Sequence, residues 1–336
     1  MLDKKRLEQY DTEKMHLVYD KWPEIARKSF ESERNSVNFD GIDHIIFAGM
    51  GGSGAIGDMF ASILSKTKIH VNVVKGYQLP KTVDSNTLVV TVSVSGNTAE
   101  TIAVLDSAHK IGSKIIAFSS GGKMIQYCKK NKIEYRIIPQ HHSPRASFTL
   151  FLYTILKVLH STLEIKEEDI LESITELEKL GSKINSLNLT NENPALSLAE
   201  WIKCIPLIYY PFGLQSAAIR FKNSLQENAK LHAMTEDVIE SCHNGIVSWE
   251  RKSNICPILI EGQNDHIKTK ERWKILKEYF ELNNIRYWEI ISTNGSILTK
   301  LINLIYLLDY ASIYLSILNK IDPSPVKSIG FIKEKL

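Results

Sequence analysis

The stretch HIIFAGMGGSGAIGDMF (residues 44–60) begins as a short apolar run, passes through a cluster of glycines and continues in a helical pattern. A strand, a glycine turn and a helix in this order are typical of one βα unit of a parallel sheet. Similar apolar runs recur outward along the chain, at residues 69–74, 87–92, 114–120, 133–139, 205–211, 255–262 and 286–293. The sequence therefore predicts an α/β fold with parallel sheets that helices cover on both faces.

The chain's length of 336 residues suits about two domains. Residues 1–35 have the pattern of one or two amphipathic helices, and a first α/β domain is predicted over residues 36–185. The polar stretch SLNLTNENPA (186–195) is typical of a boundary, and a second α/β domain is predicted over residues 195–336. Helices are predicted at about 146–185, 214–231, 269–282 and 296–319.

The composition is that of an ordinary soluble protein and argues against several other classes. The formal net charge is +3 and acids and bases are mixed, which argues against binding to nucleic acid or a membrane surface. The N-terminus lacks the apolar core of a signal peptide, and the longest apolar stretches are too short or too polar to span a membrane. The four cysteines show no close metal-ligand spacing and are expected to be free thiols. Together these features predict a cytoplasmic location.

The glycine-rich loop at residues 49–54 joins a predicted strand to a predicted helix. Ligands of open α/β sheets bind beyond the carboxyl ends of the strands, where glycines let backbone N–H groups approach an anion. Gly49, Gly51 and Gly54 also match the G-x-G-x-x-G fingerprint of dinucleotide sites. That fingerprint needs an acid at the end of the second strand, whereas residues 69–81 contain neither Asp nor Glu. The loop therefore favours a small phosphate over a dinucleotide.

A second loop, SVSGNT (residues 93–98), again joins a strand to a helix. Its three hydroxyls around a glycine suit a compact phosphate that accepts several hydrogen bonds. The alternative is an ordinary turn in which Thr98 caps the following helix. Because both loops follow strands at equivalent positions and both are rich in glycine and hydroxyls, phosphate binding is the favoured interpretation.

At these residues the chain resembles the sugar isomerase (SIS) domain family. The segments GMGGSGAIGD (49–58) and SVSGNTAET (93–101) are similar in particular to the archaeal-type bifunctional phosphoglucose/phosphomannose isomerases. Further similar segments, in the order expected for that family, are PRAS (144–147), ENAK (227–230), HNGIVSWE (243–250) and the tail IDPSPVKSIGFIKEKL (321–336). Each segment alone is weak, but the set covers most of the chain.

The resemblance implies two SIS domains, each a flavodoxin-like parallel sheet between helices, in a homodimer with active sites at the subunit interface. It implies that the substrate's phosphate binds at Gly51, Gly52, Ser53, Ser93, Ser95 and Thr98. It further places Arg145 near C1 and C2 of the sugar and makes Glu227 the catalytic base. His243, supplied by the partner subunit, and Lys333 are implied in opening the sugar ring.

Taken alone, the residue patterns around two of these positions also allow plainer interpretations. A helical glutamate such as Glu227 is usually a surface acid, here able to pair with Lys230 three residues on. Arg145 could be an ordinary surface arginine. A carboxylate is nevertheless a competent base when burial raises its pKa, and a fixed guanidinium stabilises a developing enediolate.

The same holds for the two residues implied in ring opening. Histidine titrates near neutrality and so can pass a proton, but His243 could equally be a structural histidine. Lys333 lies three residues from the end of the chain, where a frayed tail is common. The apolar spacing of Ile329, Ile332 and Leu336 instead predicts a short docked helix.

The chain departs from the family pattern at two places. Residues 147–151 read SFTLF where smaller residues are expected, and Ile239 and Cys242 stand where Pro and Asn are expected. These changes concern the shape of the pocket and hence substrate preference more than the type of reaction.

The activity implied by the resemblance is reversible conversion of glucose 6-phosphate to fructose 6-phosphate through a cis-enediol(ate). Mannose 6-phosphate is implied as a second substrate, because the enediol is planar at C2. Such proton transfer needs neither metal nor nicotinamide, and no zinc-ligand pattern is present in the sequence. His141 and His142 are adjacent, so on a strand they would point to opposite faces. The alternatives are another SIS sugar-phosphate isomerase or aminosugar-phosphate enzyme, and a non-catalytic sugar-phosphate sensor.

Overall fold

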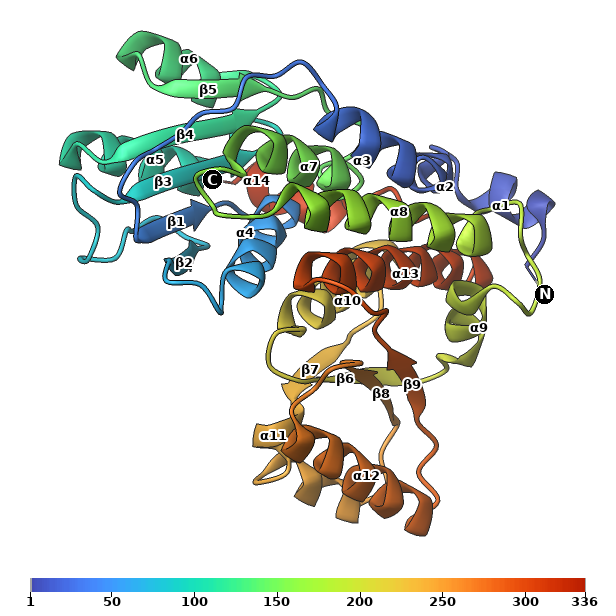
Figure 1. The fold of residues 1–336 in the computed structure, drawn as a ribbon. Helices are drawn as coiled ribbons and strands as arrows, with labels where there is room; N and C mark the ends of the chain where they lie inside the picture. Colours follow the sequence, from blue (N-terminus) through green and yellow to red (C-terminus); the bar gives the residue numbers. More distant parts are fainter. Residues whose placement is uncertain (1, 336) are drawn as a thin grey trace. The chain divides into compact units, whose positions relative to one another are not determined.

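The computed structural model describes residues 2–335 of the chain (Figure 1). The chain divides into two compact units. One, here called the N-terminal unit, comprises Lys21–Glu178 and Gly295–Thr299, and the C-terminal unit holds the rest of the described chain. The division into domains at residues 36–185 and 195–336 stays a prediction.

The sheet of the N-terminal unit has five parallel strands in the order β2-β1-β3-β4-β5. These strands are β1 His44–Ala48, β2 His70–Val74, β3 Leu88–Ser93, β4 Lys114–Ser119 and β5 Glu134–Ile137. The order is that of flavodoxin-like sheets, which confirms the predicted α/β class. β3 is buried along its whole length, as the continuous apolar run predicts for a strand covered on both faces.

Helices cover both faces of this sheet. α5 (Ala99–Ile111) and α6 (Gly122–Asn131) pack on one face, where Val104, Leu105 and Met124 join the core. α4 (Gly52–Ile63) contacts β1 and β2 on the other face and packs against α7 (Phe148–Leu159), which in turn contacts α3 (Trp22–Phe30). The arrangement can be followed in Figure 1.

One predicted helix, at about 146–185, is two helices in the structure. α7 ends at Leu159 and α8 (Glu167–Ile184) begins eight residues later. Between them Glu164 has a φ of 53°, in the left-handed region, and Ile165 N donates to the His160 carbonyl. A residue in the left-handed conformation ends a helix, and the sequence gives no sign that a glutamate will adopt this conformation.

The sheet of the C-terminal unit has four parallel strands in the order β7-β6-β8-β9. They are β6 Ile205–Tyr210, β7 Met234–Asp237, β8 Ile255–Glu261 and β9 Trp288–Ile291. Three of the four were predicted. β7, with the sequence MTED, was missed because it is an edge strand whose residues are exposed or half-buried and mostly polar.

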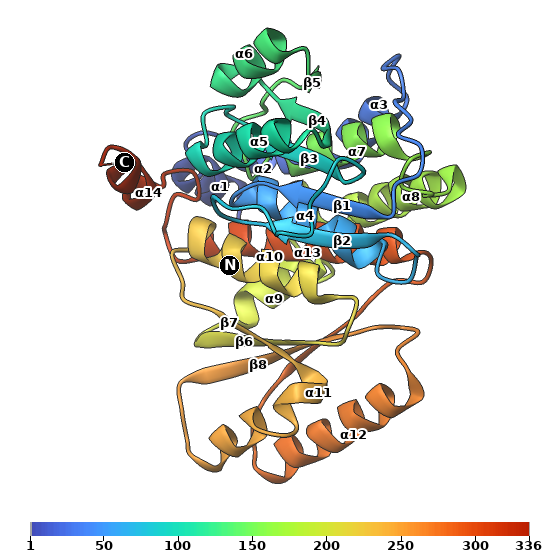
Figure 2. The same ribbon diagram turned by 90° about the vertical axis from the view of Figure 1, so that its left-hand side faces the viewer.

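Two helical layers enclose this second sheet (Figure 2). α10 (Gln215–Asn228) contacts β6 and β7 from one face. α11 (Val238–Ser241) and α12 (Ile267–Leu282) pack on the other, with the 3₁₀ helix η1 (Gly245–Glu250), around a core that includes Tyr209, Trp249 and Phe280. The unit also contains α1 (Lys4–Tyr10), α2 (Met15–Asp20), α9 (Pro194–Trp201), most of α13 (Ile297–Leu318) and α14 (Lys327–Lys333). The N-terminal segment thus forms three helices, α1 to α3, rather than one or two.

α13 is a 22-residue helix that carries a stripe of tyrosines. The hydroxyls of Tyr306, Tyr310 and Tyr314 donate to Tyr19 O, Asp20 Oδ1 and Ile184 O at 2.8, 2.5 and 2.7 Å. By length and composition this helix could cross a membrane, contrary to the sequence-based expectation. However, 83% of its apolar window is buried inside the structure, which is typical of a core helix.

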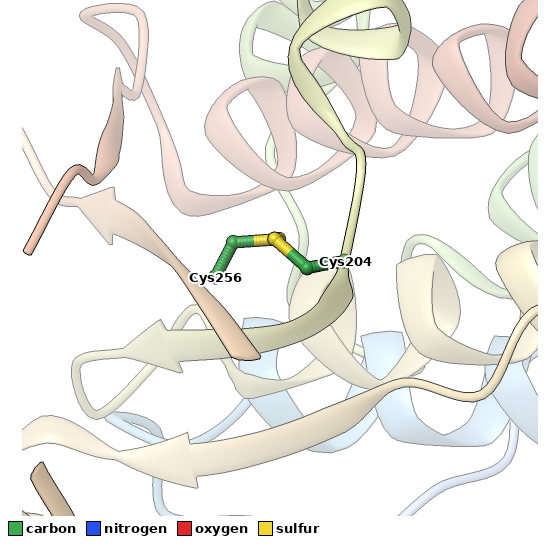
Figure 3. Close-up of a disulfide and its surroundings, with 2 residues drawn as sticks. All are labelled: Cys204 and Cys256. Atoms are coloured by element: carbon green, nitrogen blue, oxygen red, sulfur yellow. A yellow bond between two sulfur atoms is a disulfide. The ribbon is translucent and has the colours of Figure 1, made fainter. Parts of the chain in front are cut away.

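Cys204 and Cys256 form a disulfide, with Cα atoms 5.8 Å apart (Figure 3). The expectation of free thiols was therefore wrong for these two cysteines, whereas Cys128 and Cys242 are free. Cys204 directly precedes β6, and β6 pairs with β8 so that Pro206 lies opposite Cys256. Because the two are 52 residues apart in sequence, only this strand pairing brings them together.

The tail forms a short helix, α14, as predicted. Its apolar side chains are not buried: Ile329 is 38% exposed and Ile332 is 58% exposed. The predicted docking of this helix is therefore not seen, and the third residue of the predicted apolar face, Leu336, lies outside the described residues.

Candidate functional site

The first predicted phosphate loop lies at the carboxyl end of β1, as expected. Gly51 has a φ of 53° and stands at the N-cap of α4, so the helix begins with Gly52 and Ser53. The Ser53 side chain is buried, and its Oγ accepts a hydrogen bond from Val94 N at 3.4 Å. This contact joins the first loop to the second.

The second loop lies at the carboxyl end of the neighbouring strand, β3. Ser93 Oγ and Thr98 Oγ1 are 3.0 Å apart, and Ser93 Oγ accepts from Gly96 N at 3.1 Å. Asn97 N donates to Ser95 Oγ at 3.3 Å. Thr98 occupies the N-cap of α5, but its side chain makes no capping hydrogen bond. The capping alternative is thus correct for the position of Thr98 and incorrect for its hydroxyl.

Gly96 is required by the shape of this loop. Its φ is 69°, and a Cβ at this position would lie 1.8 Å from the carbonyl oxygen of Gly121. Met124 N also donates to the Gly96 carbonyl at 2.9 Å, which ties the loop to the start of α6. The backbone of the second loop is therefore held both by its close approach to Gly121 and by the hydrogen bond from Met124.

Arg145 lies against the first loop. A Cβ on Gly52 would be 3.2 Å from the Pro144 carbonyl and 3.3 Å from Arg145 Cα. Arg145 is only 6% exposed, which removes the interpretation of an ordinary surface arginine. The turn that carries it is held by Ser147, whose Oγ accepts from His141 N at 2.9 Å and lies 2.9 Å from the Ser143 carbonyl, to which it donates.

The bulky residues after Arg145 have a structural explanation. Phe148 stacks on Trp22 with ring centroids 6.2 Å apart, and Trp22 Nε1 donates to the Ala146 carbonyl at 3.1 Å. The departure from the expected small residues thus coincides with packing of α7 on α3.

The electrostatics of these loops suit an anion rather than a dinucleotide. The N-termini of α4 and α5 both lie at this edge of the sheet, and helix N-termini carry partial positive charge. β2 ends at Val74 and is followed by Lys75, whose Nζ forms an ion pair with Asp58 of α4 at 2.5 Å. A lysine therefore follows the strand where the dinucleotide fingerprint needs an acid.

Glu227 lies in the last turn of α10, in the C-terminal unit, and is half-buried. The Nζ of Lys230 donates to the main-chain carbonyl of Glu227 at 2.5 Å and to the Pro323 carbonyl at 3.4 Å. This contact is made by the main-chain carbonyl of Glu227, whereas the plainer interpretation invokes its carboxylate. Lys230 thus links the end of α10 to Pro323, which lies in the segment before α14 and Lys333.

His243 follows α11 and is exposed. Its N–H donates to the Glu240 carbonyl at 2.9 Å, and the side chain of the next residue, Asn244, donates to Glu240 Oε1 at 2.7 Å. The turn is therefore fixed while the imidazole faces outward. Lys333, at the end of α14, is exposed as well.

Glu227 and His243 lie on opposite faces of the second sheet. α10 runs back from the carboxyl end of β6 to the start of β7, whereas α11 follows the carboxyl end of β7. Figure 2 shows the two helices on either side of the strands. The predicted residues thus divide into the loops and Arg145 in the N-terminal unit, and Glu227, His243 and Lys333 in the C-terminal unit.

Glu236, which the sequence analysis did not single out, is a half-buried carboxyl near the end of β7. Its Oε2 is buried without a hydrogen-bond partner among residues 2–335, and burial raises its pKa. A Cβ on Gly245 would lie 2.4 Å from this oxygen, so the carboxyl fills the space beside the turn that follows His243. In the described part of the chain, no group of three or more His, Cys, Asp and Glu residues could hold a metal ion.

Comparisons with known proteins match both halves of the chain. The SIS domain family model matches residues 40–163, and the model described as "Bacterial phospho-glucose isomerase C-terminal SIS domain" matches residues 191–336. A bifunctional phosphoglucose/phosphomannose isomerase of Caldicellulosiruptor bescii is 33% identical over 94% of this chain and 96% of its own length. A D-glucosamine-6-phosphate 4-epimerase of Sulfolobus acidocaldarius is 29% identical over 73% of this chain and 77% of its own.

A solved structure supports the fold independently. A hypothetical protein from Thermus thermophilus matches with a TM-score of 0.75 at 13% identity, over 98% of this chain and 91% of that one. At this identity the likeness concerns the fold alone.

Proposed function

The chain belongs to the SIS-domain family of bifunctional phosphoglucose/phosphomannose isomerases, and from this premise we propose that it converts both glucose 6-phosphate and mannose 6-phosphate reversibly to fructose 6-phosphate. It is a sugar-phosphate isomerase, with a sugar phosphate as its ligand. The observation that carries the proposal is the junction of the two loops at Ser53 and Val94. There two helix N-termini lie beside serine and threonine hydroxyls, an arrangement that suits one phosphate.

In this proposal the substrate's phosphate binds to the backbone of Gly51 and Gly52 and to hydroxyls of both loops. Those hydroxyls belong to Ser53, Ser93, Ser95 and Thr98. The contact of the Arg145 backbone with Gly52 supports a position of Arg145 beside the same ligand. The buried guanidinium would then stabilise the negative oxygen of the enediolate, where fixed charge acts most strongly.

Proton transfer is assigned to Glu227. A carboxylate near C1 and C2 removes the proton from C2 of the aldose and returns it to C1. The intermediate is planar at C2, so the return proton can reach C2 from either face when the C1–C2 unit rotates. One base thus serves both the glucose and the mannose epimer.

Ring opening is assigned to His243 and Lys333, with His243 supplied by a second copy of the chain. The placement of α10 and α11 on opposite faces of the second sheet supports this assignment, since it separates His243 from Glu227 within one chain. The exposure of His243 and α14 supports it as well, because both are accessible to a partner. The active form would be a homodimer.

The test is an assay of the purified protein with each aldose phosphate in the presence of EDTA. We expect turnover of glucose 6-phosphate and mannose 6-phosphate to fructose 6-phosphate, with EDTA having no effect. Turnover of neither aldose would overturn the proposal. Turnover of glucose 6-phosphate alone would restrict it to a single specificity, which the departures at Ile239 and Cys242 could produce.

A second function is favoured by one comparison. The relative named D-glucosamine-6-phosphate 4-epimerase is nearly as similar as the isomerases. Adding glucosamine 6-phosphate and arabinose 5-phosphate to the panel separates this activity from the proposed one. A non-catalytic sensor is separated by Glu227→Gln, which should abolish turnover in an enzyme while sugar-phosphate binding persists.

We propose a cytoplasmic location, which the kinship with metabolic enzymes supports. The Cys204–Cys256 disulfide opposes it, because disulfides are uncommon in reducing compartments. Cell fractionation with thiol trapping at lysis measures both location and the oxidation state of this pair.

A further inference from the structure

A fully buried ion pair joins α10 to α13 in the C-terminal unit. Arg220 is 3% exposed and Asp309 is 0% exposed. Asp309 Oδ2 accepts from Arg220 Nε at 3.0 Å and from the terminal Nη2 at 2.6 Å. A buried pair of this kind rarely adds more stability than a well-packed apolar pair, so its presence calls for another reason.

Other side chains complete the coordination of Asp309. Ser224 Oγ donates to Asp309 Oδ1 at 2.6 Å, and the Tyr19 hydroxyl donates to Oδ2 at 3.2 Å. One turn further along α10, Asn228 Nδ2 donates to Ser312 Oγ at 2.8 Å. A continuous row of hydrogen bonds therefore fixes one face of α10 against α13.

Glu227 lies beside this row. It follows Ser224 by three residues and Arg220 by seven, two spacings that return to the same side of a helix. Side chains on a helix lean toward its N-terminus, a tendency that favours an approach of the Glu227 carboxylate to the turn that carries Ser224. Burial lowers the pKa of Arg220, but the Asp309 carboxylate and smaller contributions, which include the charge of Glu227, together outweigh burial and raise this pKa above its ordinary value.

We propose that Arg220 is a positioning residue for Glu227. Fixed by Asp309, Arg220 holds the face of α10 that presents Glu227, and its charge stabilises the ionised carboxylate that accepts the C2 proton. This inference rests on the proposed function of Glu227 as the base. Asp309 offsets the positive charge of Arg220, so the two single substitutions should act on the Glu227 carboxylate in opposite directions.

In this unit the charge of Arg220 acts on Glu227, and the Nζ of Lys230 donates to the main-chain carbonyl of Glu227. Arg220 in turn forms its ion pair with Asp309 on α13, and the Tyr19 hydroxyl on α2 donates to the same carboxylate. Replacing Arg220 and Asp309 singly and together therefore separates the effects of their charges.

The test uses the pH profile of kcat/KM for glucose 6-phosphate, whose acid limb reports the base of the free enzyme. Arg220→Met leaves Asp309 negative, so we expect the acid limb to move to higher pH by about one unit. Asp309→Asn leaves Arg220 uncompensated and should move the limb to lower pH. The double variant Arg220→Met/Asp309→Asn should lie close to wild type.

The control is Arg27→Met, which removes a surface ion pair with Glu178 in the other unit and should leave the acid limb unchanged. If Arg220→Met does not fold because it leaves a buried carboxylate unpaired, Asp309→Asn compared with the double variant still tests the sign. The inference would be overturned if Arg220→Met and Asp309→Asn both leave the acid limb unchanged, or if both move it in the same direction. A wild-type enzyme without isomerase activity would instead overturn the proposed function.

Discussion

At the scale of single residues, ring opening and proton transfer make separable demands on the site. The substrate 5-deoxyfructose 6-phosphate lacks the hydroxyl that closes the furanose ring and is therefore always open. We expect His243→Ala and Lys333→Met to lose about 10²- to 10⁴-fold in turnover of fructose 6-phosphate, yet to act on the open analogue nearly as wild type does. Glu227→Gln should lose activity on both. Loss of C1 proton signals in deuterated water, followed by NMR, measures enolisation directly.

Lys335→Met is the matched control for the tail, since it removes a charge from an exposed residue two positions after Lys333. It should leave both activities unchanged. If His243→Ala and Lys333→Met impair the open analogue as strongly as the cyclic sugar, these residues act in enolisation or binding and the assignment to ring opening fails.

Glu236 predicts a dependence of stability on pH. Burial raises the pKa of its carboxyl above the ordinary value of 4.5, which an unfolded chain would show. The native state then holds the proton more tightly, so the stability that Glu236 contributes is present below pH 4.5 and is lost as the pH rises through the raised value. Glu236→Gln should therefore unfold at higher denaturant concentration than wild type near neutral pH.

Below about pH 4 the same substitution should make no difference, because the protonated carboxyl and the amide are both neutral. Glu250→Gln, at an exposed position at the end of η1, is the control and should change little at either pH. Equal unfolding midpoints for wild type and Glu236→Gln near pH 7 would contradict the expected cost of burying this charge.

Sequence patterns located some of the relevant residues and not others, for a physical reason. The glycine and serine loops are visible because they need special backbone conformations and because hydroxyls cluster in them. Sequence patterns do not single out Arg220 and Glu236, because a charged residue on a helix or strand is usually solvated. Their burial depends on Asp309 and Gly245, which no local pattern connects to them.

At the scale of elements, the disulfide adds a covalent link between the start of β6 and β8. It encloses a loop with a sequence separation of 52 residues, for which loop-closure entropy predicts a stabilisation of about 4 kcal/mol. We expect Cys204→Ser/Cys256→Ser to lower the free energy of unfolding by up to this amount, and reductant to lower that of wild type but not of the double variant. Urea denaturation with and without dithiothreitol measures both.

Cys242→Ser is the control, because this cysteine is free and only half-buried. It should keep the sensitivity to reductant. Four reactive thiols in the unreduced, denatured protein, rather than two, would show that the bond does not form.

Element prediction succeeded where burial leaves a clear run of apolar residues. β1, β3, β4 and β8 are continuous apolar runs because helices cover both faces, and all four were predicted. β7 is polar and lies at an edge, so its pairing with β6 rather than its own composition makes it a strand. Such pairing cannot be read from a local pattern.

At the scale of the whole molecule, the second sheet separates the proposed base from the proposed ring-opening histidine. α10 carries Glu227 on one face and the turn after α11 carries His243 on the other (Figure 2). In a homodimer with isologous contacts, each copy can lend His243 to the other, so that two equivalent sites form. Oligomerisation would then be a condition for activity and not only for stability.

Subunit complementation tests this arrangement. Glu227→Gln and His243→Ala should each be nearly inactive alone. In a mixed dimer, the site that takes Glu227 from the His243→Ala chain takes His243 from the Glu227→Gln chain and is intact, whereas the other site carries both substitutions. Random mixing of equal amounts after dissociation should therefore restore about one quarter of wild-type activity.

The opposite arrangement gives a different result in the same experiment. If His243 served the site of its own chain, every site in the mixture would carry one substitution and activity would stay near zero. A mixture of Glu227→Gln and Arg220→Met is the control, because both substitutions lie on α10 and no mixed dimer could then contain an intact site. Its activity should equal the average of the two separate variants at every mixing ratio. Recovery with His243→Ala but not with Arg220→Met would therefore assign His243, and not α10, to the partner's site.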